Sequence, residues 1–276
     1  MKNVRIALGQ MEAVQGDTQA NMAKMEQMAA EAAAGGADII CFPELSYTGY
    51  FVKKDRLLEI AETENGEFYT RITRAAKENG ICIVAGFAER GQGEDIYNTA
   101  VFAGRDGTVA GKARKVYLWK SEKKRFVRGE EFPVFDTEFG GVSILTCYDL
   151  EFPEPARIAA LKGAKLIFCP AAWSVPARNR WDLDLMACSL YNMVFTAGAN
   201  FADELCCGAS GVAGPSGSMI AQSQGQKEEI VFADIDLDEA DRQREDIPYF
   251  DDMDGTVLKQ LSGALEEYRK ERKRSE

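Results

Sequence analysis

The chain has 276 residues, of which 46% are hydrophobic, and it carries a formal net charge of -11. This acidity argues against a surface for nucleic acid or for anionic membranes, and no apolar run approaches the roughly 20 residues that span a bilayer. The chain contains no histidine, which excludes Ser-His-Asp and Cys-His catalysis and leaves carboxylates, lysines, tyrosines and cysteines as candidate catalytic groups.

Strands and helices alternate along the first half of the chain. Apolar runs predict strands, and an Ala- and Met-rich segment between the capping residue Asp17 and Gly35 predicts a long helix. In chain order we expect a strand at residues 4–10, a helix at 18–34, a strand at 38–42, a helix at 67–78, and strands at 81–87, 97–103 and 108–113.

The second half continues this alternation, and no linker separates it from the first. We therefore expect a single domain over residues 1–276, with a C-terminal helical tail at about 256–276. Antiparallel meanders fit an all-parallel sheet poorly, so the pattern favours an α/β fold of two mixed sheets packed face to face with outer helices. The predicted elements are a strand at 142–146, a helix at 154–161, a strand at 165–169, a helix at 181–191, a strand at 193–199, a hairpin around 214–217, a strand at 230–235 and a helix at 256–274.

The last helix carries an apolar stripe made of Leu258, Leu261, Leu265 and Tyr268. Two interpretations are open. The stripe could dock on the body of the same chain, or it could contact a second subunit.

The seven cysteines form an odd set, and several lie within apolar strands, as is typical of reduced thiols in the cytoplasm. The N-terminus enters a strand at once and has no signal-peptide pattern, so we expect a cytoplasmic protein. There is no Cys-x-x-Cys pair and no histidine to complete a zinc site, so no metal is expected.

Cys147 is the candidate nucleophile, because an apolar run delivers it to the end of a predicted buried strand. The residues that follow, including Asp149 and Pro153, are typical of a turn into a helix. Unpaired backbone N–H groups at such a turn would favour a thiolate and could also hold an oxyanion.

A cysteine nucleophile needs a proton acceptor and a positive group for the developing oxyanion. Glu44 is the candidate base, because it follows a wholly apolar strand that would desolvate it and raise its pKa; a turn-capping role is the alternative. Lys115 can point inward on an alternating strand as the oxyanion clamp, and Glu122 could be a further carboxylate beside it. The rival cations are Lys112, Arg114 and Lys120.

Three segments, PELSYTG (43–49), RKVYL (114–118) and CYDLEFPE (147–154), resemble in order and spacing the signature segments of the nitrilase superfamily of carbon–nitrogen hydrolases. The later GAS (208–210), PSG (215–217) and DID (234–236) extend the resemblance over nearly the whole chain. The resemblance implies a four-layer αββα sandwich, a catalytic triad of Glu44, Lys115 and Cys147 with a supporting Glu122, and self-association by helix packing beside the active site. It also implies that Tyr148 contributes its backbone N–H to the oxyanion site and that no metal or organic cofactor is needed.

Two positions depart from the family pattern near the site. Tyr117 stands where the family often has histidine, and Glu151 stands where it often has arginine. We therefore expect a substrate without a carboxylate near the reacting carbon, either neutral or with an amine facing Glu151. The alternative is that Glu151 pairs with a basic side chain such as Arg157. Trp173 could line the pocket or belong to the core, and Arg178 and Arg180 could still reach an anionic substrate.

The resemblance leaves three interpretations. The favoured one is a hydrolase that acts on a small linear amide or an N-carbamoyl amine through a cysteine thioester. A nitrilase that acts on a nitrile uses the same triad, and a catalytically silent scaffold on the same fold is the third. A small-molecule substrate and a homodimer or higher homo-oligomer are the expected partners.

Overall fold

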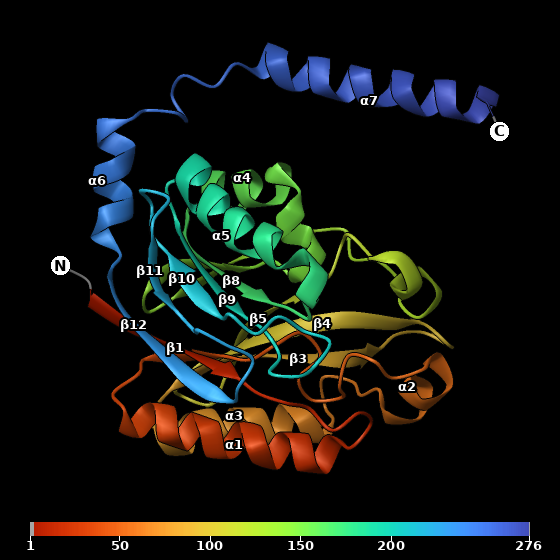
Figure 1. Cartoon of the computed structure of the whole chain (residues 1–276), viewed down its shortest axis with the longest axis vertical. Helices are drawn as coiled ribbons and strands as arrows, with labels where there is room; N and C mark the ends of the chain where they lie inside the picture. Colours follow the sequence, from red (N-terminus) through yellow and green to blue (C-terminus); the bar gives the residue numbers. More distant parts are fainter. Residues whose placement is uncertain (1–2, 276) are drawn as a thin grey trace.

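Two six-stranded mixed sheets packed face to face form the centre of the computed structural model, which describes residues 3–275 and side chains up to residue 273 (Figure 1). The strand orders are β12-β1-β2-β3-β4-β5 and β11-β10-β9-β8-β7-β6. Each sheet has parallel pairing at its centre, β1-β2-β3 in one and β7-β8-β9 in the other, with antiparallel strands on both sides.

The strands of the first sheet come from the first half of the chain, apart from the last. They are β1 (Asn3–Gln10), β2 (Ile39–Cys41), β3 (Cys82–Arg90), β4 (Ile96–Ala103), β5 (Val109–Arg114) and β12 (Glu229–Asp236). The second sheet comprises β6 (Val134–Thr137), β7 (Gly140–Ile144), β8 (Ala164–Pro170), β9 (Phe195–Ala199), β10 (Gly211–Ala213) and β11 (Met219–Gln222).

Helices cover the outer face of each sheet, as Figure 1 shows. The first sheet is covered by α1 (Thr18–Ala34) and α3 (Glu67–Asn79), and the second by α4 (Pro153–Leu161) and α5 (Arg178–Asn192). The predicted four-layer αββα sandwich is confirmed.

Several short elements were not predicted from the sequence. They are the helices α2 (Lys54–Ile60) and α6 (Asp238–Asp246), the strand β6, and the single-turn 3-10 helices η1 (Lys120–Lys124), η2 (Cys147–Glu151) and η3 (Val175–Ala177). Most of them bury few apolar side chains; α6, for example, buries only Ala240. The periodic pattern that reveals longer elements is therefore absent.

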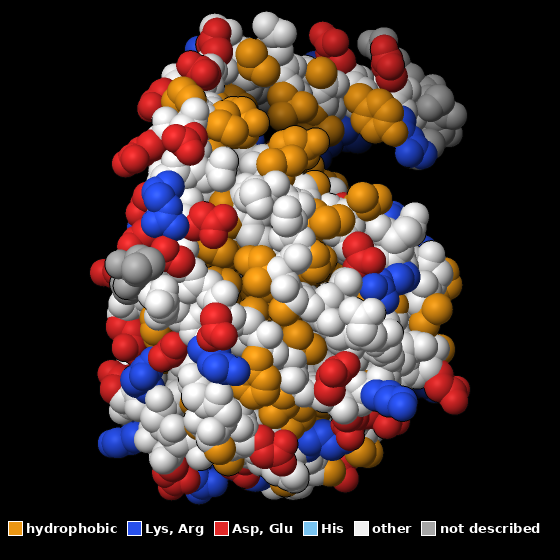
Figure 2. Space-filling model, turned by 60° about the vertical axis from the view of Figure 1, so that its left-hand side comes forward, with side chains coloured by type: hydrophobic (Ala, Val, Ile, Leu, Met, Phe, Trp, Pro, Cys, Tyr) orange, Lys and Arg blue, Asp and Glu red, His pale blue; other side chains and the backbone are white. Residues whose placement is uncertain are grey.

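The last helix, α7 (Gly255–Ser275), projects away from the body (Figure 1). Leu258, Leu261, Leu265 and Tyr268 are all about half exposed, so the stripe is not docked on the body of the same chain. Figure 2 shows apolar side chains on this helix and on the body opposite, with a gap between them. Within residues 3–275, no helix combines the length and apolar character needed to cross a bilayer.

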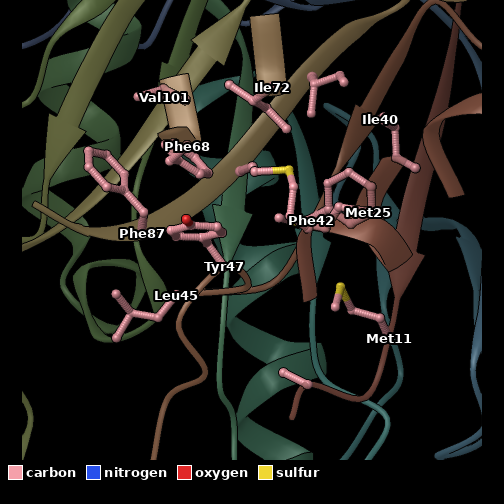
Figure 3. Packing of buried hydrophobic residues seen from close by; sticks show 14 of the residues in the cluster. Met11, Met25, Ile40, Phe42, Leu45, Tyr47, Phe68, Ile72, Phe87 and Val101 are labelled. Atoms are coloured by element: carbon pink, nitrogen blue, oxygen red, sulfur yellow. The ribbon is translucent and has the colours of Figure 1, made fainter. Parts of the chain in front are cut away.

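Three apolar cores hold the layers together. Between α1, α3 and the first sheet, Phe68 stacks on Phe87 with ring centroids 4.4 Å apart, beside Phe42 and Met25 (Figure 3). A second core lies between the two sheets, and a third lies between the second sheet and the helices α4 and α5. The second core contains side chains from both halves of the chain, so the two halves pack against each other.

Candidate active site

Glu44 lies three residues beyond the end of β2, in a tight turn between the two sheets. The turn is forced by its neighbours: Leu45 has a left-handed φ of 53°, and a Cβ on Gly86 of β3 would lie 2.5 Å from the Leu45 backbone nitrogen. Only glycine at position 86 lets β3 approach this closely. The side chain of Glu44 is fully buried.

Lys115 is the first residue after β5, where its backbone N–H donates to the carbonyl of Asn98 at 2.8 Å. The prediction that it lies on the strand itself was wrong by one residue, because the strand ends at Arg114. Its buried Nζ lies 2.6 Å from Glu44 Oε1 and 2.8 Å from Glu122 Oε1. The structure thus brings together three of the four residues predicted to be catalytic around one ammonium.

Glu122 is fixed by the η1 turn that carries it. Its Oε2 accepts a hydrogen bond from the backbone N–H of Trp119 at 2.6 Å, and its Oε1 accepts one from the hydroxyl of Tyr50 at 2.7 Å. Because both carboxylate oxygens have donors, the hydrogen bonds compensate the burial of Glu122 opposite Lys115.

Sequence reasoning missed two groups that hold Glu44. Asn98 Nδ2 donates to Glu44 Oε1 at 2.6 Å, and the backbone N–H of Ala172 donates to Glu44 Oε2 at 3.1 Å. Asn98 could have been found, because asparagine is disfavoured inside a strand and this one sits within apolar β4. Ala172 acts through its backbone, and no sequence signal points to it.

Cys147 begins η2 just beyond β7 and has a left-handed φ of 49°. It is 8% exposed and lies on the wall of a cavity of about 340 Å³. The described residues that line this cavity are Tyr50, Phe51, Trp119, Cys147, Tyr148, Glu151, Ala172, Trp173, Ser174, Pro176, Ala177, Arg180, Leu205 and Cys206.

Cys147 and the buried charges influence one another electrostatically. Burial raises the pKa of the Cys147 thiol well above its usual value, and the charge of Glu44 raises that pKa further while Lys115 lowers it. This shift favours the neutral thiol of Cys147, whereas the sequence led us to expect backbone N–H groups that favour a thiolate. Burial likewise raises the pKa of Glu44, which makes it a stronger base. The carboxylates keep the pKa of Lys115 well above its usual value despite burial, so it stays cationic.

Asp149 ties the nucleophile segment to the lysine segment. Its carboxylate accepts backbone hydrogen bonds from Tyr117 at 2.8 Å, Val116 at 3.1 Å and Thr146 at 3.2 Å. These bonds fix the chain on both sides of the site, directly after Lys115 and directly before Cys147. Burial raises the pKa of Asp149 to about 7 although the three N–H groups oppose the shift.

The three residues predicted to contact the substrate, Tyr148, Glu151 and Trp173, line one cavity. Glu151 lines the cavity and pairs with Arg180 at 3.3 Å, whereas Arg157 instead lies over the ring of Phe250. The alternative that Glu151 pairs with a basic side chain is thus correct, with a different partner. Tyr148 lines the same cavity.

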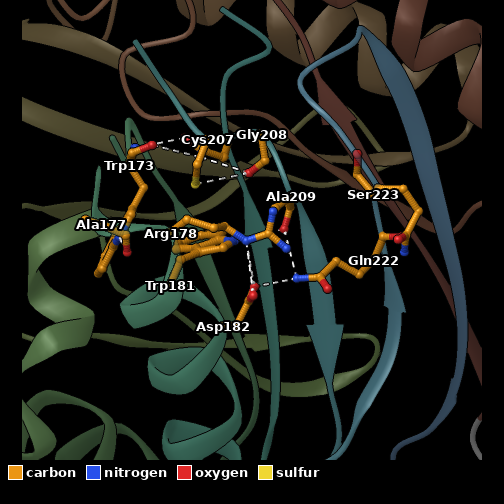
Figure 4. Close-up of polar contacts among 12 residues, drawn as sticks. Trp173, Ala177, Arg178, Trp181, Asp182, Cys207, Gly208, Ala209, Gln222 and Ser223 are labelled. Atoms are coloured by element: carbon orange, nitrogen blue, oxygen red, sulfur yellow. Dashed lines mark hydrogen bonds and ion pairs between the residues drawn. The ribbon is translucent and has the colours of Figure 1, made fainter. Parts of the chain in front are cut away.

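The loop that follows β8 forms another wall of the cavity. Trp173 lines the cavity and also belongs to the core, where its ring lies 5.2 Å from that of Trp181 and its Nε1 donates to the carbonyl of Ala177. Figure 4 shows that Arg178 is directed to Asp182 instead; the two groups approach to 3.1 Å. Arg178 is therefore not a lining residue, and Arg180 is.

Comparisons with known proteins identify the family of the chain. The carbon–nitrogen hydrolase family model matches residues 5–245. The chain is 34% identical to the 2-oxoglutaramate amidase of Bacillus subtilis, over 79% of this chain and 85% of that one, and 36% identical to a nitrilase of Pyrococcus abyssi, over 85% and 90%. A double mutant of the amidase from Nesterenkonia sp. AN1, solved with acrylamide, superposes with a TM-score of 0.84 at 28% identity and covers 95% of this chain and 98% of that one.

The chain therefore belongs to the carbon–nitrogen hydrolase family of the nitrilase superfamily. The predicted family membership and the predicted carbon–nitrogen hydrolase class are confirmed.

Proposed function

We propose that the protein hydrolyses a small linear amide or N-carbamoyl amine through a thioester on Cys147 and releases ammonia. The observation that carries this proposal is the buried Glu44–Lys115–Glu122 cluster, which lies close enough to Cys147 to shift its pKa, at the wall of a cavity of about 340 Å³. This arrangement supplies a nucleophile, a base and a cation in one buried site.

In the first half of the reaction, Glu44 accepts the proton of the Cys147 thiol as the sulfur attacks the substrate carbonyl carbon. The negative charge that develops on the carbonyl oxygen is held by Lys115 Nζ and by the backbone N–H of Tyr148 in the first turn of η2. The raised pKa of Glu44 suits this role, because a stronger base takes the thiol proton more readily.

In the second half, Glu44 returns the proton to the leaving nitrogen, and ammonia departs as the C–N bond breaks. Glu44 then removes a proton from water, which attacks the thioester carbon, and the sulfur leaves with that proton. The products are a carboxylic acid from an amide, or a carbamic acid that loses carbon dioxide from an N-carbamoyl amine. Glu122 stays ion-paired with Lys115 and keeps the ammonium positioned.

The names of the relatives support an amide substrate, since two of those compared above are amidases. A nitrile substrate is the second candidate, because the Pyrococcus abyssi relative is named a nitrilase and a nitrile would pass through the same thioester. A nitrile consumes two waters, one before and one after thioester formation. The seven free, buried cysteines support a reducing compartment, and we place the protein in the cytoplasm on that basis.

The test is ammonia release from short amides, N-carbamoyl amines and nitriles, measured for the wild type and for Cys147→Ala. We expect turnover of at least one amide or carbamoyl compound, and a loss in the variant of at least about a thousandfold, because no other group replaces the nucleophile. Cys82→Ala, in the core between the sheets, is the matched control and should retain activity. Equal turnover by the wild type and Cys147→Ala would reject the mechanism. If neither protein were active on any compound, the interpretation as a catalytically silent scaffold would be favoured.

We also propose that two copies associate through the outer face of α4 and α5, with α7 reaching across. A cavity of about 650 Å³ separates α7 from these helices (Figure 2). Its apolar lining includes Ile158, Leu161 and Tyr191 on the body and Leu258 and Leu261 on α7. Such a stretch of exposed apolar surface on both sides of a gap is typical of a protein–protein interface.

A further inference from the structure

The lining of the active-site cavity contains one pair of oppositely charged side chains. Of the described residues that line the cavity, two have formally charged side chains, Glu151 and Arg180. Their side chains are 20% and 47% exposed, respectively, so the carboxylate is the more enclosed of the two. Whatever the substrate presents beyond its reacting group therefore meets this pair.

Arg180 is not free to receive a substrate carboxylate. Its guanidinium pairs with Glu151 at 3.3 Å, and the charge of Asp184, one helical turn further along α5, also acts on it. Asp184 Oδ2 is buried and has no hydrogen-bond partner in the structure. Asp184 lies outside the lining of the active-site cavity, so within that lining one carboxylate and one guanidinium are paired and their charges cancel.

The distance from the nucleophile also limits what can reach this pair. Glu151 and Cys147 lie at the two ends of η2, four residues apart. At about 2 Å of rise per residue in a 3-10 helix, their backbones are separated by roughly 8 Å along the axis. A short linear substrate whose carbonyl carbon meets Cys147 therefore presents its other end near Glu151.

The remaining walls are largely aromatic. Trp119 and Tyr148 lie edge to face with their ring centroids 4.7 Å apart, and Tyr50 and Trp173 complete an aromatic lining. The faces of these rings offer no hydrogen bond to a desolvated carboxylate, and the rings of Trp119 and Tyr50 already contact the cationic groups of Lys120 and Arg125.

We propose that Glu151 is a specificity-determining residue that selects substrates whose far end is a cation, such as a primary ammonium, and rejects those that end in a carboxylate. This inference rests on the proposed amide hydrolysis and names its substrate class. A carboxylate would have to displace Glu151 from Arg180, whereas an ammonium adds a second cation to the Glu151 carboxylate.

The test compares three amides of equal length at pH 7.5: 5-aminopentanamide, hexanamide and adipamate. They differ only in an ammonium, a methyl or a carboxylate at the far end. We expect kcat/KM to fall in that order, with at least about a tenfold preference for the ammonium over the carboxylate, because a single charge-assisted contact is worth that much.

Variants assign the preference to the residue. In Glu151→Gln the ratio of kcat/KM for 5-aminopentanamide to that for adipamate should fall at least about tenfold, since Arg180 is released at the same time. In Arg180→Gln the same ratio should rise, because the repulsive cation is gone. Asp136→Asn is the matched control: Asp136 is an exposed carboxylate on β6 outside the lining of both cavities, and the ratio should not change.

The outcomes separate this inference from the proposed function. A wild-type preference for adipamate, or equal turnover of the three amides, would overturn the role of Glu151 and leave amide hydrolysis standing. A ratio that is unchanged in both Glu151→Gln and Arg180→Gln would also overturn it. Ammonia release from none of the three, together with no amide or carbamoyl substrate in the broader screen, would reject the proposed function and this inference with it.

Discussion

Each buried charge of the active site is matched by donors or by an opposite charge, and this explains how the fold tolerates them. Burial of an unpaired carboxylate or ammonium costs on the order of several kcal/mol, whereas an ion pair whose hydrogen bonds are all satisfied can be buried at a smaller cost. Lys115 bonds to Glu44 and Glu122, and the carboxylates receive further bonds from Asn98 and Tyr50. Removal of any one partner therefore leaves a charge without compensation.

The buried Asp149 predicts a specific pH dependence of stability. Its pKa is raised from 3.8 to about 7 in the folded state, so the folded protein binds the proton more tightly than the unfolded chain does. The contribution to stability is fully present below pH 3.8 and is lost as the pH rises through 7. We expect the free energy of unfolding of the wild type to fall relative to Asp149→Asn between pH 4 and 8, by up to about 4 kcal/mol.

Urea unfolding at several pH values would measure this difference. Asp136→Asn, at an exposed position of β6, is the control and should follow the wild type. Parallel curves for the wild type and Asp149→Asn would show that Asp149 does not titrate in this range.

At the scale of elements, the close approach of β3 to the turn after β2 holds the base in place. In Gly86→Ala, the new methyl group would lie 2.5 Å from the Leu45 backbone nitrogen and would push the turn that carries Glu44. We expect kcat/KM to fall at least about tenfold, because small displacements of catalytic groups are costly. The free energy of unfolding should fall by about 1–3 kcal/mol through overpacking.

Steady-state kinetics and thermal unfolding would test this prediction. Gly263→Ala in α7 meets no atom within 4 Å and should leave activity unchanged, with stability unchanged or slightly raised. Wild-type activity in Gly86→Ala would mean that the turn can relax without moving Glu44.

The long elements and the core of the site were predictable because both follow simple patterns. Glu44, Lys115 and Cys147 each come just beyond the end of a strand, namely β2, β5 and β7. Because β7 lies in the other sheet and β5 is antiparallel to β4, the resemblance to the family, and not the strand order, predicted that the three residues converge. Asn98 was missed although an asparagine within an apolar strand is itself a signal, and Ala172 was missed because it contributes only a backbone N–H. The partner of Glu151 could not be predicted either, since Arg180 reaches it from a helix 29 residues further along the chain.

At the scale of the whole molecule, the placement of α7 was beyond sequence reasoning. Its apolar stripe was visible, but a stripe indicates burial without naming the surface that buries it. In the structure the stripe is exposed, and the body presents apolar side chains across a gap (Figure 2).

Self-association through this surface predicts a clear response to a charge placed within it. Leu261→Asp puts a carboxylate in the cavity between α7 and the body, and desolvating that carboxylate in an interface is costly. We expect the dimer dissociation constant, measured by sedimentation velocity over a concentration series, to rise at least about tenfold. Val14→Asp, at an exposed apolar residue next to α1, is the control and should not change it. A wild type that stays monomeric at high concentration would contradict the proposed assembly.

Glu151 lines two cavities, the active-site cavity and the cavity between α7 and the body. A substrate in the first cavity and a second subunit at the other cavity would therefore both contact the carboxylate of Glu151. Thermodynamic linkage is reciprocal. If dimer formation changes the affinity for the substrate by some factor, substrate binding must change the dimer association constant by the same factor. Dilution of the enzyme would then change its affinity for the substrate, because Glu151 contributes to both sites.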